Sequence, residues 1–120
     1  MIKCGTDIVR IERLETINPA IRARFIRRVF TPRELAQAGT ESEALAGLFA
    51  AKEAVSKALG TGIGKMSWQS IEIIHAQSGE PALHLHDEAL KAALARGLTE
   101  WAVSITHDGG LALAFVVARG

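Results

Sequence analysis

Two carboxylates, a lysine and a glycine-rich segment could together form a site for a metal-assisted phosphate reaction. Glu53 and Lys57 lie four residues apart in a stretch expected to be helical, so their side chains would share one face. Three glycines follow within residues 60–64, where free backbone N–H groups could face phosphate oxygens. Asp7 interrupts the apolar pattern of an expected strand, and Mg²⁺ prefers carboxylate oxygens that it can share with substrate phosphates. These residue types and spacings predict a divalent-metal and phosphate site.

Each of these residues also has a purely structural explanation. A Glu–Lys pair at this spacing is common on helix surfaces, where it contributes about 0.2–0.5 kcal/mol. Gly60 could simply close the helix, and Asp7 could cap a turn that begins near Arg10. Considered one residue at a time, both explanations remain open.

Charge is distributed unevenly along the chain, although the net charge is only +1. Residues 1–33 carry eight basic and three acidic side chains, whereas residues 34–120 carry six basic and ten acidic ones. Few aromatic residues accompany the basic end, which disfavours stacking on single-stranded nucleic acid. An acidic protein or a phosphate-rich ligand fits better, although such a cluster is often only a solvated helix face. The arginines concerned are Arg13, Arg22, Arg24, Arg27 and Arg28.

The histidines carry a weaker signal. His107 stands between an expected strand and an Asp-Gly-Gly turn, where a lone histidine is usually incidental. His84 and His86 would share one face of a strand, but no cysteine or third ligand is near them in the sequence. A zinc site at this pair is therefore disfavoured.

The length and composition indicate one globular domain spanning residues 1–120. The chain is 48% hydrophobic and 22% charged, and no apolar run approaches the roughly 18 residues that would span a bilayer. Its N-terminus lacks the pattern of a secretion signal. The single cysteine permits no intrachain disulfide, which is typical of a reducing compartment. We expect a cytoplasmic protein without membrane association.

The first half of the chain predicts one strand followed by helices. Residues 2–9 alternate as a strand, and residues 10–16 suggest a short helix or turn. Asn18-Pro19 begins a helix whose apolar stripe is Ile21, Phe25 and Val29. A capping box at Thr31-Pro-Arg-Glu34 begins another helix, which ends near Gly39. A long central helix then covers about 43–59 and is closed by Gly60.

The second half predicts mostly strands. Residues 70–75 and 82–86 form a hairpin around a turn at 78–81. Asp87 is expected to cap a helix that runs to about Arg96 and is closed by Gly97. Two further strands, 101–106 and 111–118, are joined by Asp108-Gly-Gly110. The order of strand, helices and strands predicts an α+β fold with a largely antiparallel sheet.

Four stretches of the chain resemble the holo-acyl-carrier-protein synthase family of small 4′-phosphopantetheinyl transferases. They are Gly5-Thr-Asp-Ile-Val-Arg-Ile-Glu-Arg13, Phe30-Thr-Pro-Arg-Glu34, the segment from Phe49 to Gly64, and Val103-Ser-Ile-Thr-His-Asp108. The resemblance extends over essentially the full length. It implies a single domain of the 4′-phosphopantetheinyl transferase type. It also implies a magnesium-dependent reaction that moves phosphopantetheine from coenzyme A to a serine of apo-acyl carrier protein. The other product is adenosine 3′,5′-bisphosphate, and the reaction supports fatty acid biosynthesis.

The resemblance also implies roles for individual residues. Asp7 and Glu53 match the magnesium ligands, Lys57 matches a phosphate-contacting lysine, and Glu53 is the expected acceptor of the serine proton. His107 matches a coenzyme A contact that a neighbouring subunit supplies, because family members are typically homotrimers with sites between subunits. The acidic carrier protein would dock on the arginines named above. The remaining coenzyme A contacts would be Gly60, Thr61, Gly62 and Gly64 beside the pyrophosphate, and Gly79 and Pro81 at the adenosine end.

Two positions depart from the family pattern. Many members have arginine where this chain has Leu48, and a basic residue where it has Glu80. Both changes remove positive charge near the expected coenzyme A site. If the family's basic residues there help to hold coenzyme A, Leu48→Arg and Glu80→Lys should each strengthen phosphate binding at a partly exposed site. Alternatively, nearby cations already compensate, Lys65 and Arg96 being the unassigned ones. The competing hypothesis is a non-enzymatic, basic-faced module that binds an acidic protein or RNA. It would explain the arginines but leave Asp7, Glu53 and the glycines as coincidences.

Overall fold

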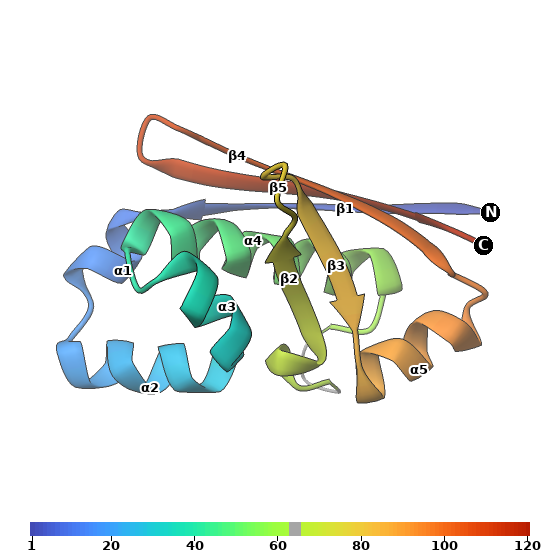
Figure 1. Cartoon of the computed structure of the whole chain (residues 1–120), viewed down its shortest axis with the longest axis horizontal. Helices are drawn as coiled ribbons and strands as arrows, with labels where there is room; N and C mark the ends of the chain where they lie inside the picture. The colour runs from blue at the N-terminus through green and yellow to red at the C-terminus, as the bar shows by residue number, and fades with distance from the viewer. Residues whose placement is uncertain (63–65) are drawn as a thin grey trace.

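A computed structural model describes residues 1–62 and 66–120 of the chain. A three-stranded sheet lies over the long helix α4, as Figure 1 shows. Helices α1, α2 and α3 lie together at one end of the molecule, and a two-stranded hairpin with α5 lies towards the other. In chain order the elements are β1 (Ile2–Arg10), α1 (Glu12–Thr16), α2 (Pro19–Val29), α3 (Pro32–Ala38), α4 (Ser42–Leu59), η2 (Trp68–Ser70, a 3₁₀ turn), β2 (Ile71–His75), β3 (Pro81–Leu85), α5 (Asp87–Ala95), β4 (Glu100–Asp108) and β5 (Leu111–Arg119).

The predicted α+β class is confirmed, and the helix boundaries follow local chemistry. The Asn18 side chain accepts hydrogen bonds from the backbone of Ala20 and Ile21, so it caps α2. Thr31 and Glu34 exchange both bonds of a capping box at the start of α3. Gly60 follows α4 with φ 74°, a left-handed conformation that glycine adopts without a steric penalty. All three caps were predicted from the sequence.

Two details of the helices differ from the prediction. Ile21 is 45% exposed, and the inward side of α2 is instead formed by Arg22, Phe25, Ile26 and Val29. A strict spacing of four drifts around a helix of 3.6 residues per turn, so residue 21 leaves the buried face.

The cap of α5 was also predicted wrongly. Asp87 is the first residue of α5 rather than its cap. His86 occupies the cap position, but its side chain makes no hydrogen bond to the helix end. His86 is engaged elsewhere, because its Nε2 lies 3.1 Å from the Glu72 carboxylate on β2. The His86 side chain therefore contacts the β2–β3 hairpin instead of capping α5.

The sheet presents a face of small residues to α4. Strand β5 is central and pairs antiparallel with β1 and β4. Its inward residues include Ala112, Ala114 and Ala118, which are almost completely buried. A β-carbon at Gly5 on β1 would collide with the carbonyl of Ala54 and lie 2.9 Å from the backbone nitrogen of Ala58. The helix therefore rests against the sheet at backbone distance.

The opposite face of this sheet is open and partly apolar. Ile8 on β1 is 56% exposed, and Leu113 and Phe115 on β5 are 37% and 43% exposed. The registers place Ile8 opposite Leu113 and Thr6 opposite Phe115, so these side chains lie side by side. Within residues 1–62 and 66–120, no helix is both long and apolar enough to cross a bilayer.

Candidate active site between β1 and α4

Asp7 and Lys57 meet where β1 crosses the second half of α4. The Lys57 ammonium lies 3.0 Å from Asp7 Oδ1 and donates a 2.9 Å hydrogen bond to the carbonyl of Thr6. Asp7 points inward because residues 5, 7 and 9 of the strand alternate towards the helix. The Asp7 side chain is 18% exposed and that of Lys57 is 53% exposed, so the pair opens to solvent on the lysine side.

Glu53 lies one helical turn before Lys57 and shares its face. Burial raises the pKa of Glu53; the Asp7 carboxylate raises it further, and Lys57 opposes the shift. Because Lys57 contacts Asp7 and lies one helical turn after Glu53, both carboxylates lie on the same side of α4, although the chain separates them by 46 positions. The structure thus brings together Asp7, Glu53 and Lys57 as the sequence predicted.

These two carboxylates could hold a divalent cation with an incomplete protein ligand set. In the part of the chain that the structure describes, no group of three His, Cys, Asp or Glu side chains is arranged around one point. A magnesium ion at Asp7 and Glu53 would therefore complete its coordination with water and phosphate oxygens, which is its usual preference. Burial and then the Asp7 carboxylate raise the Glu53 pKa, and a cation held by both carboxylates would relieve the repulsion between them.

The glycine segment begins directly after the site. Gly60 and Gly62 have φ values of 74° and 68°, and a β-carbon at either would meet no atom within 4 Å. Thr61 lies between them, and its hydroxyl is 3.8 Å from the sulfur of Met66. The backbone here is open enough for a ligand to approach. Gly64, the fourth predicted contact, lies outside the described residues.

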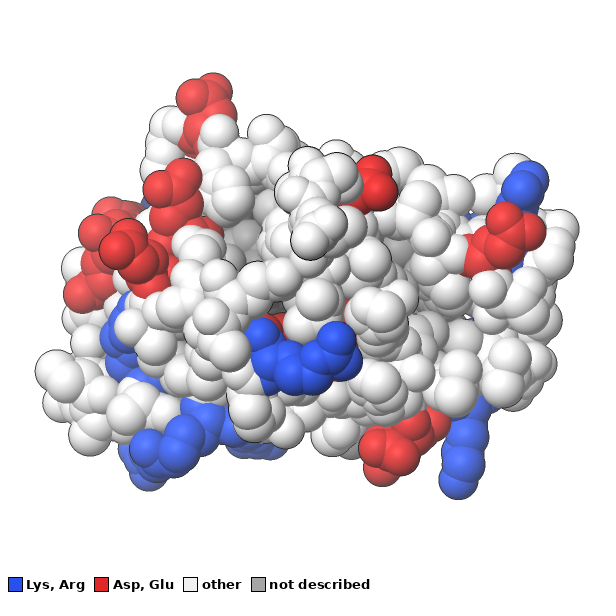
Figure 2. All heavy atoms as spheres, viewed as in Figure 1, with Lys and Arg blue, Asp and Glu red and all other residues white. Residues whose placement is uncertain are grey.

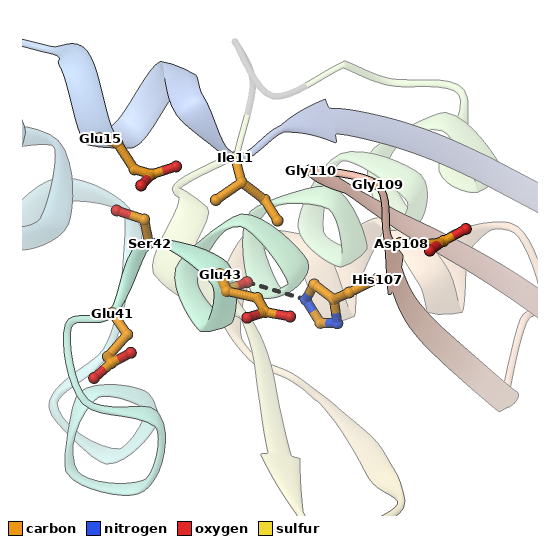
Figure 3. A pocket seen from close by; sticks show the side chains of 9 residues that line it. All are labelled: Ile11, Glu15, Glu41, Ser42, Glu43, His107, Asp108, Gly109 and Gly110. Carbon is orange, nitrogen blue, oxygen red and sulfur yellow. Dashed lines mark hydrogen bonds between the residues drawn. The ribbon is translucent and has the colours of Figure 1, made fainter.

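His107 lies at the other end of α4. Its Nε2 donates a 3.0 Å hydrogen bond to the carbonyl of Glu43, at the rim of a cavity of about 460 Å³ (Figure 3). The His107 ring lies beside Glu43 and Gly47, which precede Glu53 by ten and six residues, or about 15 and 9 Å along a helix. Within one chain, His107 is therefore remote from the predicted metal ligands.

Gly79 and Pro81 belong to the turn of the second sheet. Gly79 has φ 92° and donates a 2.8 Å hydrogen bond to the carbonyl of Ala76, and Pro81 begins β3. His75, which pairs with Pro81, lines an apolar cavity of about 290 Å³ together with His107. The hairpin turn is therefore on the His107 side of α4, not on the Asp7 side.

The prediction that position 48 is partly exposed is wrong. Leu48 is 2% exposed and belongs to the core, where it contributes to the wall of the cavity shared by His75 and His107. An arginine at this position would have to desolvate its guanidinium group, so it would not add a simple surface attraction to phosphate. Glu80, by contrast, is exposed in the hairpin turn.

Four of the five predicted docking arginines are exposed: Arg13, Arg24, Arg27 and Arg28. Figure 2 shows basic side chains along the lower left edge over α2, beneath a group of acidic ones. Arg22 differs, because its guanidinium bonds to the carbonyls of Leu14 and Thr40 at 3.1 and 2.7 Å and to Ser42 Oγ at 3.1 Å. Arg22 therefore ties α2 to its neighbours, and its role in docking stays a prediction.

A buried ion pair beside the site was missed. The Lys52 ammonium lies 2.9 Å from Glu34 Oε1, and both side chains are completely buried. Burial lowers the pKa of Lys52, and the Glu34 carboxylate opposes the shift. The sequence could have indicated this ion pair. Lys52 follows Ala50 and Ala51 in a buried stretch of the helix, and a buried lysine needs an oppositely charged partner.

Comparisons with known proteins identify the family of this chain. Residues 3–116 match the model of the 4′-phosphopantetheinyl transferase superfamily. A holo-[acyl-carrier-protein] synthase of Caldanaerobacter subterraneus is 42% identical over 119 residues, covering 97% of this chain and 93% of the relative.

Two crystal structures of such synthases match the fold. That of Helicobacter pylori, in complex with coenzyme A, has a TM-score of 0.86 and 34% identity, covering 99% of this chain and 100% of the other. That of Neisseria meningitidis has a TM-score of 0.86 and 40% identity, with complete coverage of both chains. The chain therefore belongs to the holo-acyl-carrier-protein synthase family of the 4′-phosphopantetheinyl transferase superfamily.

Proposed function

We propose that this chain, acting as one domain over residues 1–120, transfers the 4′-phosphopantetheine group of coenzyme A to a serine of apo-acyl carrier protein. The products are holo-carrier protein and adenosine 3′,5′-bisphosphate. The observation that carries this function is the meeting of Asp7, Glu53 and Lys57 beside an open glycine segment, in a chain of this family. The competing hypothesis, a non-enzymatic module that binds an acidic protein or RNA, does not explain the cluster of Asp7, Glu53 and Lys57.

Asp7, Glu53 and Lys57 have different roles in the proposed reaction. A magnesium ion held by Asp7 and Glu53 would supply positive charge to the phosphate oxygens as charge develops on the leaving group. Lys57 exposes its ammonium towards solvent and can contact a phosphate oxygen there. Glu53 accepts the proton of the attacking serine, directly or through water. Gly60, Thr61 and Gly62 offer open backbone beside the pyrophosphate.

The labelling reaction tests this function. Purified protein should attach the phosphopantetheine of coenzyme A to apo-acyl carrier protein when magnesium is present, and chelation should stop the reaction. Mass spectrometry of the carrier measures the added group, and a carrier whose acceptor serine is replaced by alanine is the control. Unmodified carrier at saturating coenzyme A and magnesium would contradict the proposal. We further propose that the reaction takes place in the cytoplasm and supports fatty acid biosynthesis.

We also propose a homotrimer in which each active site lies between two subunits. The exposed apolar side chains Ile8, Leu113 and Phe115 on the outer face of the sheet support association with further copies. The distance of about 15 Å along α4 between Glu43, which bonds His107, and Glu53 supports donation of His107 across the interface. Gly79 and Pro81 would reach the adenosine end in the same way.

Mixing two inactive variants tests the shared site. Glu53→Gln removes the proposed base, and His107→Ala removes the coenzyme A contact. After the two chains are mixed and allowed to exchange subunits, some interfaces combine an intact Glu53 with an intact His107, so part of the activity should return. Steady-state labelling of the carrier measures the recovery, and each variant incubated alone is the control. A fully active monomer by analytical ultracentrifugation would overturn the assembly.

The carrier protein is proposed to dock on the exposed arginines. Arg24, Arg27 and Arg28 project from α2, and Arg13 from α1. Acyl carrier proteins are acidic, so opposite charge would steer and orient the encounter. Because exposed charges are screened over about 8–10 Å at physiological ionic strength, added salt should weaken carrier binding more than coenzyme A binding.

A further inference from the structure

Helix α2, which bears three of the proposed docking arginines, is held at both ends by long side chains. Arg22 fixes its first turn to the carbonyls of Leu14 and Thr40. At the other end, the Gln69 side chain donates hydrogen bonds to the carbonyl of Arg27 at 2.8 Å and to that of Phe30 at 3.2 Å. Gln69 lies in η2, the element against which α2 chiefly packs.

The two hydrogen bonds from Gln69 satisfy backbone carbonyls at the C-terminal end of α2. The last carbonyls of a helix have no partner within the helix and need one from elsewhere. A glutamine amide carries two N–H bonds, and Gln69 Nε2 directs them to two carbonyls at the end of α2. One of these carbonyls belongs to Arg27, itself a proposed docking residue, and Arg28 follows it directly. Gln69 therefore holds the backbone from which these two arginines project.

The turn η2 is itself fixed to the helix of the active site. The Lys52 ammonium donates hydrogen bonds to the carbonyls of Trp68, at 3.1 Å, and Ile71. The Trp68 ring also stacks on Phe49 with centroids 5.0 Å apart, and Phe49 in turn contacts Phe25 of α2 at 5.2 Å. Lys52 immediately precedes Glu53 on α4. A continuous set of contacts thus runs from the proposed base, through η2, to the end of α2.

We propose that Gln69 is a positioning residue for the acyl carrier protein, which it serves by fixing the C-terminal end of α2 relative to α4. The inference rests on the proposed docking of the carrier on α2. A docked carrier must place its serine at Glu53, so the orientation of Arg27 and Arg28 against α4 determines how productively it binds. The proposed coenzyme A contacts Lys57, Gly60, Thr61 and Gly62 lie outside α2, the helix that this bond fixes.

Two variants of Gln69 test the assignment. Gln69→Leu removes the amide, and Gln69→Glu keeps its size but directs a carboxylate at the two carbonyls. Each should raise the KM for the carrier by about three- to tenfold, the effect of one or two lost hydrogen bonds, and leave the KM for coenzyme A within about twofold. Gln69→Glu carries the test if Gln69→Leu does not fold. Equal increases in both KM values, or an unchanged KM for the carrier, would overturn the inference.

Gln37 provides a matched control within the same chain. Its amide also bridges two elements: Nε2 donates to the carbonyl of His75 at 2.7 Å, and Oε1 accepts from the His75 backbone N–H at 2.6 Å. That bridge joins α3 to β2 and does not touch α2. Gln37→Leu should therefore leave the KM for the carrier unchanged, and a rise equal to that of Gln69→Leu would overturn a specific role for Gln69.

Charge reversal at Arg24 separates this inference from the function on which it rests. Arg24 is exposed on α2, so Arg24→Glu should raise the KM for the carrier whatever Gln69 does. If Arg24→Glu raises that KM and the Gln69 variants do not, the positioning role is wrong and the docking surface stands. If Arg24→Glu has no effect either, the docking surface is wrong and the inference falls with it.

Discussion

Replacing Glu53 by glutamine should lower the rate of phosphopantetheine transfer by about two to four orders of magnitude, the range over which loss of a general base is felt. The same change should leave the fold intact. Burial and the neighbouring Asp7 already raise the pKa of Glu53, so its charge is held at a cost that a neutral amide of similar size does not incur. Single-turnover labelling of the carrier measures the rate, and thermal denaturation measures the fold.

Asp7→Asn should have a comparable effect on the rate, because it removes the charge of the second proposed magnesium ligand. It also breaks the 3.0 Å pair with Lys57, but that pair is partly exposed and contributes at most about 1 kcal/mol to stability. Glu88→Gln, at an exposed carboxylate on α5, is the matched control and should remain fully active. Either site variant that kept most of its activity in saturating magnesium would exclude that residue as a ligand.

Replacing Lys52 by methionine should cause the largest loss of stability of any change described for this chain, about 3–5 kcal/mol. The variant leaves the Glu34 carboxylate completely buried without its ion-pair partner. It also removes the donor for the carbonyls of Trp68 and Ile71. Small domains are stable by only about 5–15 kcal/mol, so a large part of the population could unfold. Urea denaturation followed by circular dichroism measures the loss.

Two companion variants make this result specific. Lys91→Met removes an exposed lysine from α5 and should change stability by less than about 0.5 kcal/mol. The double variant Lys52→Met with Glu34→Gln removes both buried charges, and it should lose less stability than the sum of the two single changes. A loss below about 1 kcal/mol for Lys52→Met alone would mean that the buried pair contributes little.

The parts of the fold that sequence analysis predicted depend on short stretches of chain. The caps at Asn18 and Thr31 and the closing Gly60 are each read from a few adjacent residues, because the groups they satisfy lie within one turn. The meeting of Asp7 and Glu53 is different, since it joins distant segments. The two residue types suggested a shared metal site, and the packing of β1 on α4 explains why the side chains meet.

The missed roles of Arg22 and Lys52 depend on partners far away in the sequence. Arg22 looked like one more surface arginine because Thr40 and Ser42, which receive its guanidinium, lie 18 and 20 residues on. The Lys52 partner Glu34 was assigned only to its capping box, yet its carboxylate serves both. Leu48 was interpreted by comparison with other sequences, whereas its burial follows from the packing of α4 in this chain.

The absence of a side chain at Gly5 determines more than how closely a helix can lie on a sheet. Because Gly5 lets the backbone of β1 rest on that of α4 at Ala54 and Ala58, the gap between Asp7 and Glu53 is determined by main-chain contact. Rotamer changes can move the two carboxylates, but the backbones that carry them stay at this separation. A methyl group at position 5 would act as a wedge, lifting the strand and parting the two acids while leaving both in place. The separation of Asp7 and Glu53 thus depends on Gly5, a residue two positions before Asp7 that has no functional group of its own.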